Sequence, residues 1–425
     1  MRVLWLSSTN TLFDEKGDRA YNGKGWISSL QKTVTEYLPD IQLGVAFLSK
    51  RGGGPEIQDN VTYYKIRRNS PAGFRKLVHN WTGLFSESYD SDILRAADDF
   101  KPDIVQIFGC ETKLASGTVS IKGIPVAVHI QGVLNEALKS FFPGDISGKD
   151  FILPGTFINE VLLRNGAIHL REDYASRAEK ETKYLAAMRF ALGRTLWDRQ
   201  IVKKYSSAEY FHVDEVLREE FYACAGVWKP RNRNAGSPVR IMSTISNAPY
   251  KGLDLIMKCA GILRKGGFPV HWDVVGIRAD DPLIKVFSRR YGISCRDSGI
   301  RFRGILDPEG IISVMKASDL YVHPSYIENS PNSVCEAQMT GIPVLAAATG
   351  GIPSIVTDKE TGLLFEPGDA EGLAECIRQI SSDADTSARL GCNGAIKAAS
   401  RHDRKKISAD LKAAYIQCMK DYPRI

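Results

Sequence analysis

Apolar runs alternate with amphipathic stretches along nearly the whole chain. Runs rich in β-branched and aromatic residues predict strands, and stretches with helical periodicity predict the connecting helices. In the first half, strands are predicted at 3–6, 42–47, 104–107 and 126–130, and helices at 26–37, 92–99 and 173–192. Strands that alternate with helices in this way favour an α/β protein with parallel sheets.

A polar run rich in turn-forming residues interrupts this pattern at 230–238. A new strand follows at once, at 239–242, and the alternation of strands and helices then resumes. Such a run is typical of an interdomain linker. We therefore predict a first domain at 1–228, a linker at 229–238 and a second domain from residue 239.

Composition places the chain among ordinary soluble enzymes, with 43% hydrophobic and 25% charged residues. No apolar run approaches the ~18–20 residues of a membrane span. The eight cysteines show no zinc-type spacing, so we expect a reducing cytoplasmic location. The net charge of +7 does not call for nucleic acid, but it suits anionic small substrates and an acidic membrane surface.

The stretch from residue 320 to 347 carries the most informative chemistry. It predicts a buried strand, a loop with Glu328, a helix with Ser330 as N-cap and Pro331 at its first position, and a second strand. Glu336 then lies inside the helix, about 7–9 Å from its start. The free amides at that start form an anion site. Two carboxylates on either side of a phosphate-sized site suit a sugar nucleotide.

The motifs of this stretch are Glu328, then Glu336-Ala337, Gly341-Ile342-Pro343-Val344 and Gly350-Gly351-Ile352-Pro353. In this order and spacing they resemble the donor site of retaining glycosyltransferases of family 4. The resemblance implies the GT-B fold, in which two Rossmann-like domains with parallel sheets face each other across a cleft. It also implies a second domain that ends at 404 and a C-terminal helix, 405–425, that crosses back to the first domain.

The resemblance assigns roles to individual residues. It implies that Glu328 holds the hydroxyls of the donor sugar, that Glu336 holds the ribose, and that Lys251 contacts the diphosphate. Further donor-binding positions follow from the same family pattern: the helix start at Ser330, Asn332 and Ser333, the glycine loop with Gly23 and Gly25, and the strand ends at Gly276 and Arg303.

The chain departs from the family pattern at two places. The arginine that usually precedes the lysine is replaced by Ile245 or Ser246, so the second basic contact is open between Arg240, Arg278 and Arg303.

In the first domain, Gln131 occupies a slot that is usually histidine, and His129 lies two residues earlier. His129 is either a catalytic group or a buried strand histidine. Arg194 and Asp198 either line the cleft or form a structural ion pair.

The implied reaction moves a sugar from a nucleoside diphosphate sugar, UDP-linked rather than GDP-linked, to a hydroxyl of a saccharide or lipid-linked acceptor. The anomeric configuration is retained, and the expected context is surface polysaccharide or glycolipid synthesis. We expect no cofactor and no metal, because Asp280-Asp281 matches no part of the donor pattern. The alternatives are a sugar-nucleotide 2-epimerase and a non-catalytic sugar-nucleotide binding protein.

Basic and aromatic residues are interleaved in the first domain at 63–68, at 74–77 and at Trp81. This pattern suits a headgroup interface and predicts a peripheral contact with the inner face of a membrane. The alternative is a solvated loop with a few packed aromatic residues.

Overall fold

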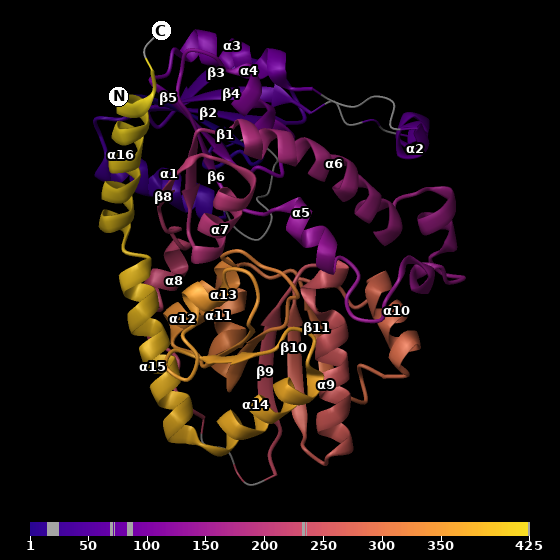
Figure 1. Cartoon of the computed structure of the whole chain (residues 1–425). Helices are drawn as coiled ribbons and strands as arrows, with labels where there is room; N and C mark the ends of the chain where they lie inside the picture. The colour runs from indigo at the N-terminus through magenta and orange to yellow at the C-terminus, as the bar shows by residue number, and fades with distance from the viewer. Residues whose placement is uncertain are drawn as a thin grey trace.

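The computed structural model describes residues 1–14, 25–68, 71, 73–82, 88–231, 234 and 236–423. Two β-sheets lie in two domains stacked one above the other, and helices cover both faces of each sheet (Figure 1). The predicted α/β class with parallel sheets is confirmed. No helix among the described residues is both long and apolar enough to span a membrane.

The sheet of the first domain has eight strands in the order β3-β4-β2-β1-β5-β6-β7-β8. All neighbours run parallel except β3 and β4. The strands are β1 (Arg2–Ser7), β2 (Gln42–Ser49), β3 (Gly53–Gln58), β4 (Val61–Arg67), β5 (Ile104–Phe108), β6 (Val126–His129), β7 (Phe190–Gly193) and β8 (Glu209–His212). The helices are α1 (Trp26–Tyr37), α2 (Gly73–Thr82), α3 (Asp90–Phe100), α4 (Gly117–Ser120), α5 (Leu134–Ala137), α6 (Ala167–Ala187) and α7 (Leu196–Tyr205).

The helix predicted at 173–192 is wrong at both ends. It begins earlier, at Ala167, and ends at Ala187, where Met188 adopts an extended conformation. The run Phe190–Gly193 is fully buried and pairs with β6 and β8 as strand β7. A short apolar run directly after a helix shows no period of its own, so the sequence pattern merged it with the helix.

The sheet of the second domain has six parallel strands in the order β11-β10-β9-β12-β13-β14. The strands are β9 (Val239–Thr244), β10 (Val270–Val275), β11 (Ile300–Gly304), β12 (Leu320–His323), β13 (Val344–Ala347) and β14 (Leu363–Phe365). The helices are α9 (Leu253–Lys265), α10 (Pro282–Tyr291), α11 (Pro308–Ala317), α12 (Asn332–Thr340), α13 (Ile352–Ile355), α14 (Ala370–Ser382) and α15 (Ala384–Arg401).

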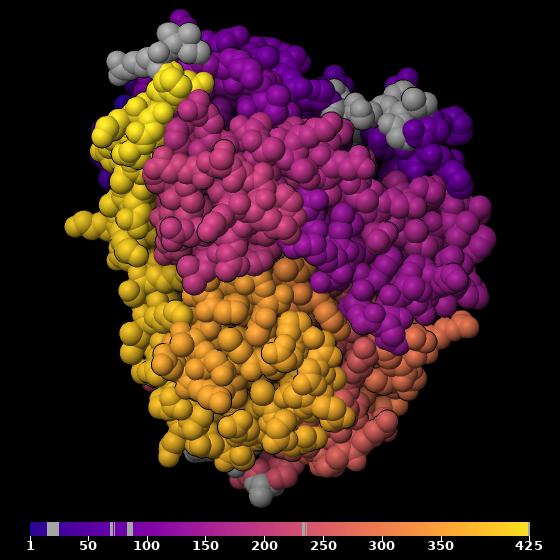
Figure 2. Space-filling view, viewed as in Figure 1, coloured from indigo at the N-terminus to yellow at the C-terminus, as the bar shows by residue number. Residues whose placement is uncertain are grey.

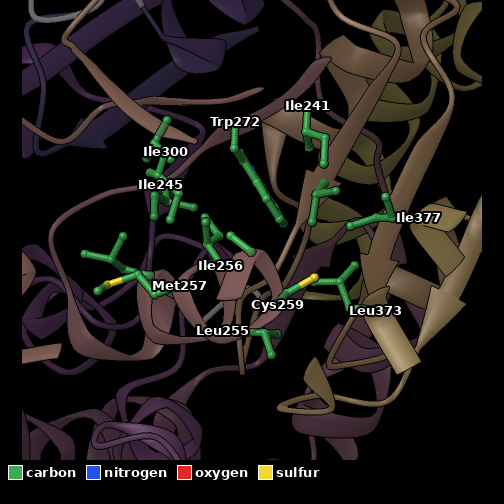
Figure 3. Packing of buried hydrophobic residues seen from close by; sticks show 14 of the residues in the cluster. Ile241, Ile245, Leu255, Ile256, Met257, Cys259, Trp272, Ile300, Leu373 and Ile377 are labelled. Atoms are coloured by element: carbon green, nitrogen blue, oxygen red, sulfur yellow. The ribbon is translucent and has the colours of Figure 1, made fainter. Parts of the chain in front are cut away.

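The core of the second domain packs α9 and α14 against one face of its sheet. Figure 3 shows Ile256 and Cys259 of α9, Ile377 of α14 and Trp272 of β10 in this core. The Trp272 indole donates a hydrogen bond to Ser243 Oγ over 3.0 Å, so the one polar atom of this large side chain is satisfied. A satisfied, close-packed core makes the strand ends a rigid support for the loops that follow them.

The chain passes from one domain to the other at two places, and in addition Ile146 and Phe151 of the first domain pack into the core of the second. The first crossing follows β8, because Val216 lies in the core of the first domain whereas Leu217 and Phe221 of helix α8 (Glu219–Ala223) lie in a core of the second. The predicted boundary near Lys229 lies after this crossing and helix α8. The second crossing lies between α15 and α16 (Arg404–Asp421), whose Tyr415 accepts a hydrogen bond from the Trp5 indole over 2.9 Å. The end of the chain thus runs along one side of both domains (Figure 2).

Candidate functional site

Loops at the carboxyl ends of β6, β7 and β12 meet between the two domains. Asn329, in the loop after β12, is buried and donates its side-chain amide to the backbone carbonyl of Gln131 over 2.9 Å. Its carbonyl oxygen accepts a hydrogen bond from the Thr195 hydroxyl, also over 2.9 Å. Asn329 therefore joins two loops of the first domain to the loop that carries Glu328.

Glu328 and Lys251 form an ion pair in this interdomain region. The Lys251 ammonium lies 2.6 Å from Glu328 Oε1, and His323 Nε2 lies 3.3 Å from the same oxygen. Lys251 ends a single 3₁₀ turn, η5 (Pro249–Lys251), and the next residue is Gly252 at φ +82°. A Cβ at that position would lie 2.3 Å from the Pro324 carbonyl oxygen, so glycine is what allows the lysine to approach the β12 loop.

The charges around Glu328 keep it ionised. Burial by itself would raise the pKa of this carboxyl, but Lys251 and His323 outweigh burial and hold the pKa well below its ordinary value of 4.5. A carboxylate that stays charged in a confined site is a strong hydrogen-bond acceptor. Glu328 can therefore bind hydroxyl groups.

Close packing against the backbone of residues 328–329 explains why the motif has glycine at both positions after β13. Gly350 has φ +52°, and a Cβ on it would lie 1.8 Å from the Glu328 carbonyl oxygen. Gly351 donates its backbone amide to that same oxygen over 3.0 Å, and a Cβ on it would lie 2.2 Å from the Asn329 carbonyl oxygen. Both glycines thus support the backbone of the loop that presents Glu328 and Asn329.

Glu336 binds Arg218, a residue that the sequence analysis did not single out. The guanidinium holds both carboxylate oxygens, with Nε to Oε1 at 2.7 Å and Nη2 to Oε2 at 2.8 Å. Both side chains are largely buried, and burial raises the pKa of Glu336 while Arg218 opposes that rise. Arg218 thus brings a cation next to α12, the helix that was predicted to face the donor.

The three arginines considered for the second basic contact lie elsewhere. Arg240 is at the amino end of β9, at the opposite edge of the sheet, and Arg278 is exposed beside Asp280. Arg303, in contrast, is exposed at the carboxyl end of the edge strand β11, where the neighbouring Gly304 carbonyl accepts the Gly276 amide over 2.7 Å, so its predicted role in donor binding stays a prediction. Arg218 precedes the glutamate by 118 residues and has no motif around it, so only the fold brings the two together.

Ser330 does not cap α12, so this prediction is wrong. Pro331 is the N-cap, and Asn332 and Ser333 form the first turn. The Ser330 hydroxyl donates instead to Glu215 Oε1 over 2.7 Å, because the buried Glu215 carboxylate is the stronger acceptor in reach.

Glu215 is buried at the first crossing and is surrounded by positive charge. Its Oε2 lies 3.5 Å from Arg401 and 3.8 Å from Arg194. Although burial raises the pKa of Glu215, these arginines and His402 hold it below its ordinary value. Cys335 and His402 lie close enough to share a metal ion with Glu215, but the two guanidinium groups disfavour a cation there.

Arg194 and Asp198 serve different purposes. Asp198 completes a capping box with Thr195, the N-cap of α7: its carboxylate accepts the backbone amides of Arg194 over 2.6 Å and of Thr195 over 3.2 Å. Burial raises the pKa of Asp198 to about 6. The Arg194 guanidinium instead lies 5.0 Å from the ring centroid of Trp26, in addition to its contact with Glu215. The predicted ion pair between the two side chains is not formed.

His129 is wholly buried at the end of β6. Its ring packs edge-on to Trp26 and stacks on Phe108, and Nδ1 lies 3.3 Å from the Gln106 amide. Burial lowers the pKa of His129 well below its ordinary value, so the ring is neutral. Gln131 is partly exposed, and its side-chain oxygen accepts a hydrogen bond from the Trp26 indole over 3.4 Å.

The predicted glycine positions differ in their surroundings. Gly25 is the N-cap of α1 with an ordinary φ of −68°, whereas Gly23 lies outside the described residues. Gly276 directly follows β10 and has φ +98°, and a Cβ on it would lie 2.2 Å from the Ile245 carbonyl oxygen. Gly276 therefore lets the ends of β9 and β10 approach closely.

Comparison with known proteins finds a family that resembles the second domain. Residues 229–397 match the family described as glycosyl transferases group 1. The D-inositol 3-phosphate glycosyltransferase of Corynebacterium efficiens is 39% identical over 95 residues, which are 22% of each chain. That of Corynebacterium glutamicum is 32% identical over 173 residues, which are 39% of this chain and 40% of the relative. The similarity thus spans less than half of these curated relatives.

Solved structures resemble the whole chain in fold. Sucrose-phosphate synthase from Thermosynechococcus elongatus has a TM-score of 0.70 at 15% identity and covers 99% of this chain and 100% of its own. Anabaena HepE in complex with UDP-glucose has a TM-score of 0.60 at 15% identity and covers 98% of this chain and 100% of its own. At these identities the likeness concerns the fold, which is the GT-B arrangement of two facing domains.

Proposed function

We propose that the chain transfers a sugar from a nucleoside diphosphate sugar to an acceptor hydroxyl, with retention at the anomeric carbon. The match of residues 229–397 to the group 1 glycosyl transferases supports the proposal. The observation that carries the proposal is the ion pair of Lys251 and Glu328, 2.6 Å apart at the point where Asn329 joins the domains. The pair supplies a cation for the phosphate and a carboxylate for the hydroxyls of a sugar phosphate.

The donor spans the two glutamates. Glu328 accepts hydrogen bonds from the hydroxyls of the sugar, and Glu336, oriented by Arg218, accepts those of the ribose. Lys251 and the first amides of α12 face the diphosphate between them. The solved complexes of HepE with UDP and with UDP-glucose favour a UDP-sugar as the donor.

The leaving diphosphate is stabilised by Lys251 and helix amides, which act on the charge that develops as the glycosidic bond to phosphate breaks. Activity is therefore expected to persist in excess EDTA. Glu328 lies at the hydroxyls of the sugar and not beneath the anomeric carbon, so the acceptor oxygen attacks from the face that the diphosphate leaves. A diphosphate oxygen takes the hydroxyl proton, which gives retention without a protein nucleophile.

The acceptor side of the proposal includes a membrane surface. Phe74 and Trp81 lie seven positions apart on one face of α2 and are 77% and 55% exposed. The Trp81 indole donates to the Leu162 carbonyl over 3.0 Å, which joins α2 to the exposed Ile158 and Leu162 of η4 (Ile158–Leu162). We call these four side chains the α2 patch.

Basic residues flank the α2 patch, as a contact with acidic lipid requires. Arg75 and Lys76 are exposed on α2, and the Arg164 guanidinium lies 5.1 Å from the Trp81 ring centroid. The predicted contribution of residues 63–68 is wrong in part, because Tyr63 and Tyr64 are buried in β4. The inner face of a membrane and a lipid-linked saccharide acceptor fit the patch that remains, and they suit polysaccharide or glycolipid synthesis.

A transfer assay with product NMR tests the proposed function. The protein is incubated with UDP-glucose, and with a panel of other UDP- and GDP-sugars, in the presence of saccharide acceptors. An α-linked donor is expected to give an α-linked product, and a β-linked product would overturn the mechanism. Conversion of the donor to its 2-epimer without acceptor would instead favour an epimerase, and absence of turnover with bound donor would favour a binding protein.

A further inference from the structure

Glu111 is a carboxyl group in the interdomain region that nothing in the proposed chemistry uses. It follows strand β5 by three residues, and its carboxylate folds back over Gly109, where a Cβ would lie 2.6 Å from Oε2. Gly109 has φ +90°. Gly132, after β6, borders the same carboxylate, since a Cβ there would lie 3.6 Å from Cδ. Two glycines thus leave room for this side chain at the carboxyl edge of the sheet.

The neighbouring Glu181 is a structural carboxylate, because both of its oxygens accept hydrogen bonds from the protein. Its oxygens accept the backbone amides of Leu134 and Asn135, each over 2.9 Å, and so cap helix α5. Glu111 Oε2 is buried without a hydrogen-bond partner among the described residues, although the residue as a whole is partly exposed. A buried carboxylate oxygen without a partner is costly, and it requires an explanation such as a missing ligand.

The nearby cation does not neutralise Glu111. Arg177 donates one guanidinium nitrogen to the Glu111 backbone carbonyl over 2.8 Å and another to the Asp173 carboxylate over 3.0 Å. No ion pair joins the Glu111 side chain to a cation in the described ranges. Its carboxylate therefore retains its capacity to accept hydrogen bonds.

Tyr250 links Glu111 to the donor side. Its hydroxyl lies 3.5 Å from that of Tyr174, and it immediately precedes Lys251. Burial raises the pKa of Tyr250, and the negative charges of Glu328 and Glu111 raise it further. The geometry agrees, because Gly132, which borders the Glu111 carboxylate, directly follows Gln131, whose carbonyl accepts the Asn329 amide of the second domain.

We propose that Glu111 accepts a hydrogen bond from a hydroxyl of the acceptor and so selects an acceptor whose reacting unit is a neutral polyol. This inference rests on the proposed function, and it names the substrate class of the same site. A phosphate at this position would face the charges of Glu111 and Glu181, whereas a hydroxyl would supply the missing donor to Oε2. The hydroxyl keeps its proton at this contact, so Glu111 positions the acceptor.

The contact has a pH signature. Burial raises the pKa of Glu111 to about 7, and Glu181 adds to the rise, whereas backbone hydrogen bonds from Glu111 and Gly132 to the carboxyl, and the charge of Arg177, oppose it. The ionised carboxylate is the better acceptor, so acceptor binding should weaken as pH falls through about 7. The groups that face Glu111 are Arg177 and Glu181 of α6, Cys110 of its own loop and Tyr250 of η5.

The test compares Glu111→Gln with Glu179→Gln, a matched change at an exposed position of α6. UDP release from UDP-glucose is measured with glucose and myo-inositol as neutral acceptors and with D-inositol 3-phosphate as the anionic one. Wild type and Glu179→Gln should prefer the neutral acceptors, with kcat/KM rising through pH 7. Glu111→Gln should raise the acceptor KM about tenfold or more, and its kcat/KM should no longer rise through pH 7.

Donor binding separates this inference from the proposed function. The affinity of Glu111→Gln for UDP-glucose without acceptor should equal that of wild type, and its Tm should be equal or higher because a desolvated charge is removed. Failure of the wild type to bind any nucleotide sugar would overturn the proposed function. With donor bound, three results would overturn the role of Glu111: preference for D-inositol 3-phosphate, no response to any neutral polyol, or unchanged acceptor KM in Glu111→Gln.

Discussion

Asn329 of the second domain and Gln131 of the first are joined by a hydrogen bond of 2.9 Å between a side-chain amide and a backbone carbonyl. The glutamate next to Asn329 carries the ion pair to Lys251, and the glutamine is the residue that replaces the expected histidine. One loop of the second domain therefore both contacts the first domain and carries Glu328, which predicts that closure of the domains and assembly of the site are coupled.

Replacing Asn329 with alanine should weaken closure of the domains. The change removes hydrogen bonds to Gln131 and Thr195, each worth about 0.5–1.5 kcal/mol. We expect a larger radius of gyration by small-angle X-ray scattering and a lower kcat. Asn393→Ala is the control, because its amide binds only an exposed carbonyl within the second domain. Equal scattering and kcat for Asn329→Ala and wild type would contradict the coupling.

Lys251→Ala should weaken the binding of UDP-glucose and of UDP but leave the binding of uridine unchanged, because the lysine acts on the diphosphate as a point charge. A charged contact of about 1.5–3 kcal/mol corresponds to a loss of roughly 10-fold to 150-fold in affinity. Isothermal titration of the three ligands measures it. An equal loss for all three would indicate damage to the fold rather than to a phosphate contact.

The Lys251–Glu328 pair should make stability depend on acid pH. The pKa of Glu328 in the folded protein lies below its ordinary value of 4.5, so its contribution is present above that value. The contribution is lost as pH falls through the lower, folded-state pKa, because the unfolded chain binds the proton first. Urea unfolding between pH 7 and pH 3 should show a shallower loss of stability in Glu328→Gln than in wild type. Parallel curves for the two proteins would refute the shift.

Arg218 should matter to donor binding through Glu336. Arg218→Lys keeps the charge but loses the two-point contact of 2.7 and 2.8 Å, so affinity for UDP should fall. A double-mutant cycle with Arg218→Gln and Glu336→Gln isolates the coupling, which we expect at about 1–3 kcal/mol in unfolding free energy. Additive losses in the two variants would show that the pair is not energetically coupled.

The α2 patch should bind acidic vesicles. Phe74→Ser with Trp81→Ser removes its exposed aromatic residues without touching a core, so co-sedimentation with vesicles containing phosphatidylserine should drop. Each basic residue near such a surface contributes about 1 kcal/mol, so wild-type binding should weaken in salt and with neutral lipid. Ile396→Ser, an equally exposed apolar residue of α15, is the control. Identical binding to neutral and acidic vesicles would remove the membrane proposal.

The sequence alone predicted those site residues that belong to a local motif, because the spacing to their neighbours along the chain identifies them. Glu328, Glu336 and the glycines after β13 belong to one continuous stretch, so their spacing could be read directly. Arg218, Glu215 and Glu111 were missed because their partners come from strands and loops far away in the chain. No local period or cap marks such residues.

The errors of the sequence analysis have physical causes of the same kind. Ser330 has the right residue type and position for an N-cap, but a buried carboxylate from the first crossing offers it a stronger partner. The run at 190–193 became a strand because β6 and β8 supply its hydrogen bonds. In both places tertiary contacts outweighed local preference.

The two crossings between the domains lie beside each other. His402 Nδ1, where α15 gives way to α16, donates to the backbone carbonyl of Glu215 over 2.8 Å at the first crossing. Both covalent links between the domains therefore lie on one side of the molecule (Figure 1). On the α10 side the connection is non-covalent: Ile146 and Phe151 of the first domain pack into the core of the second, and Arg290 of α10 lies 2.5 Å from Asp145. Any opening of the domains would therefore break contacts on the α10 side first, because the covalent links restrain the opposite side.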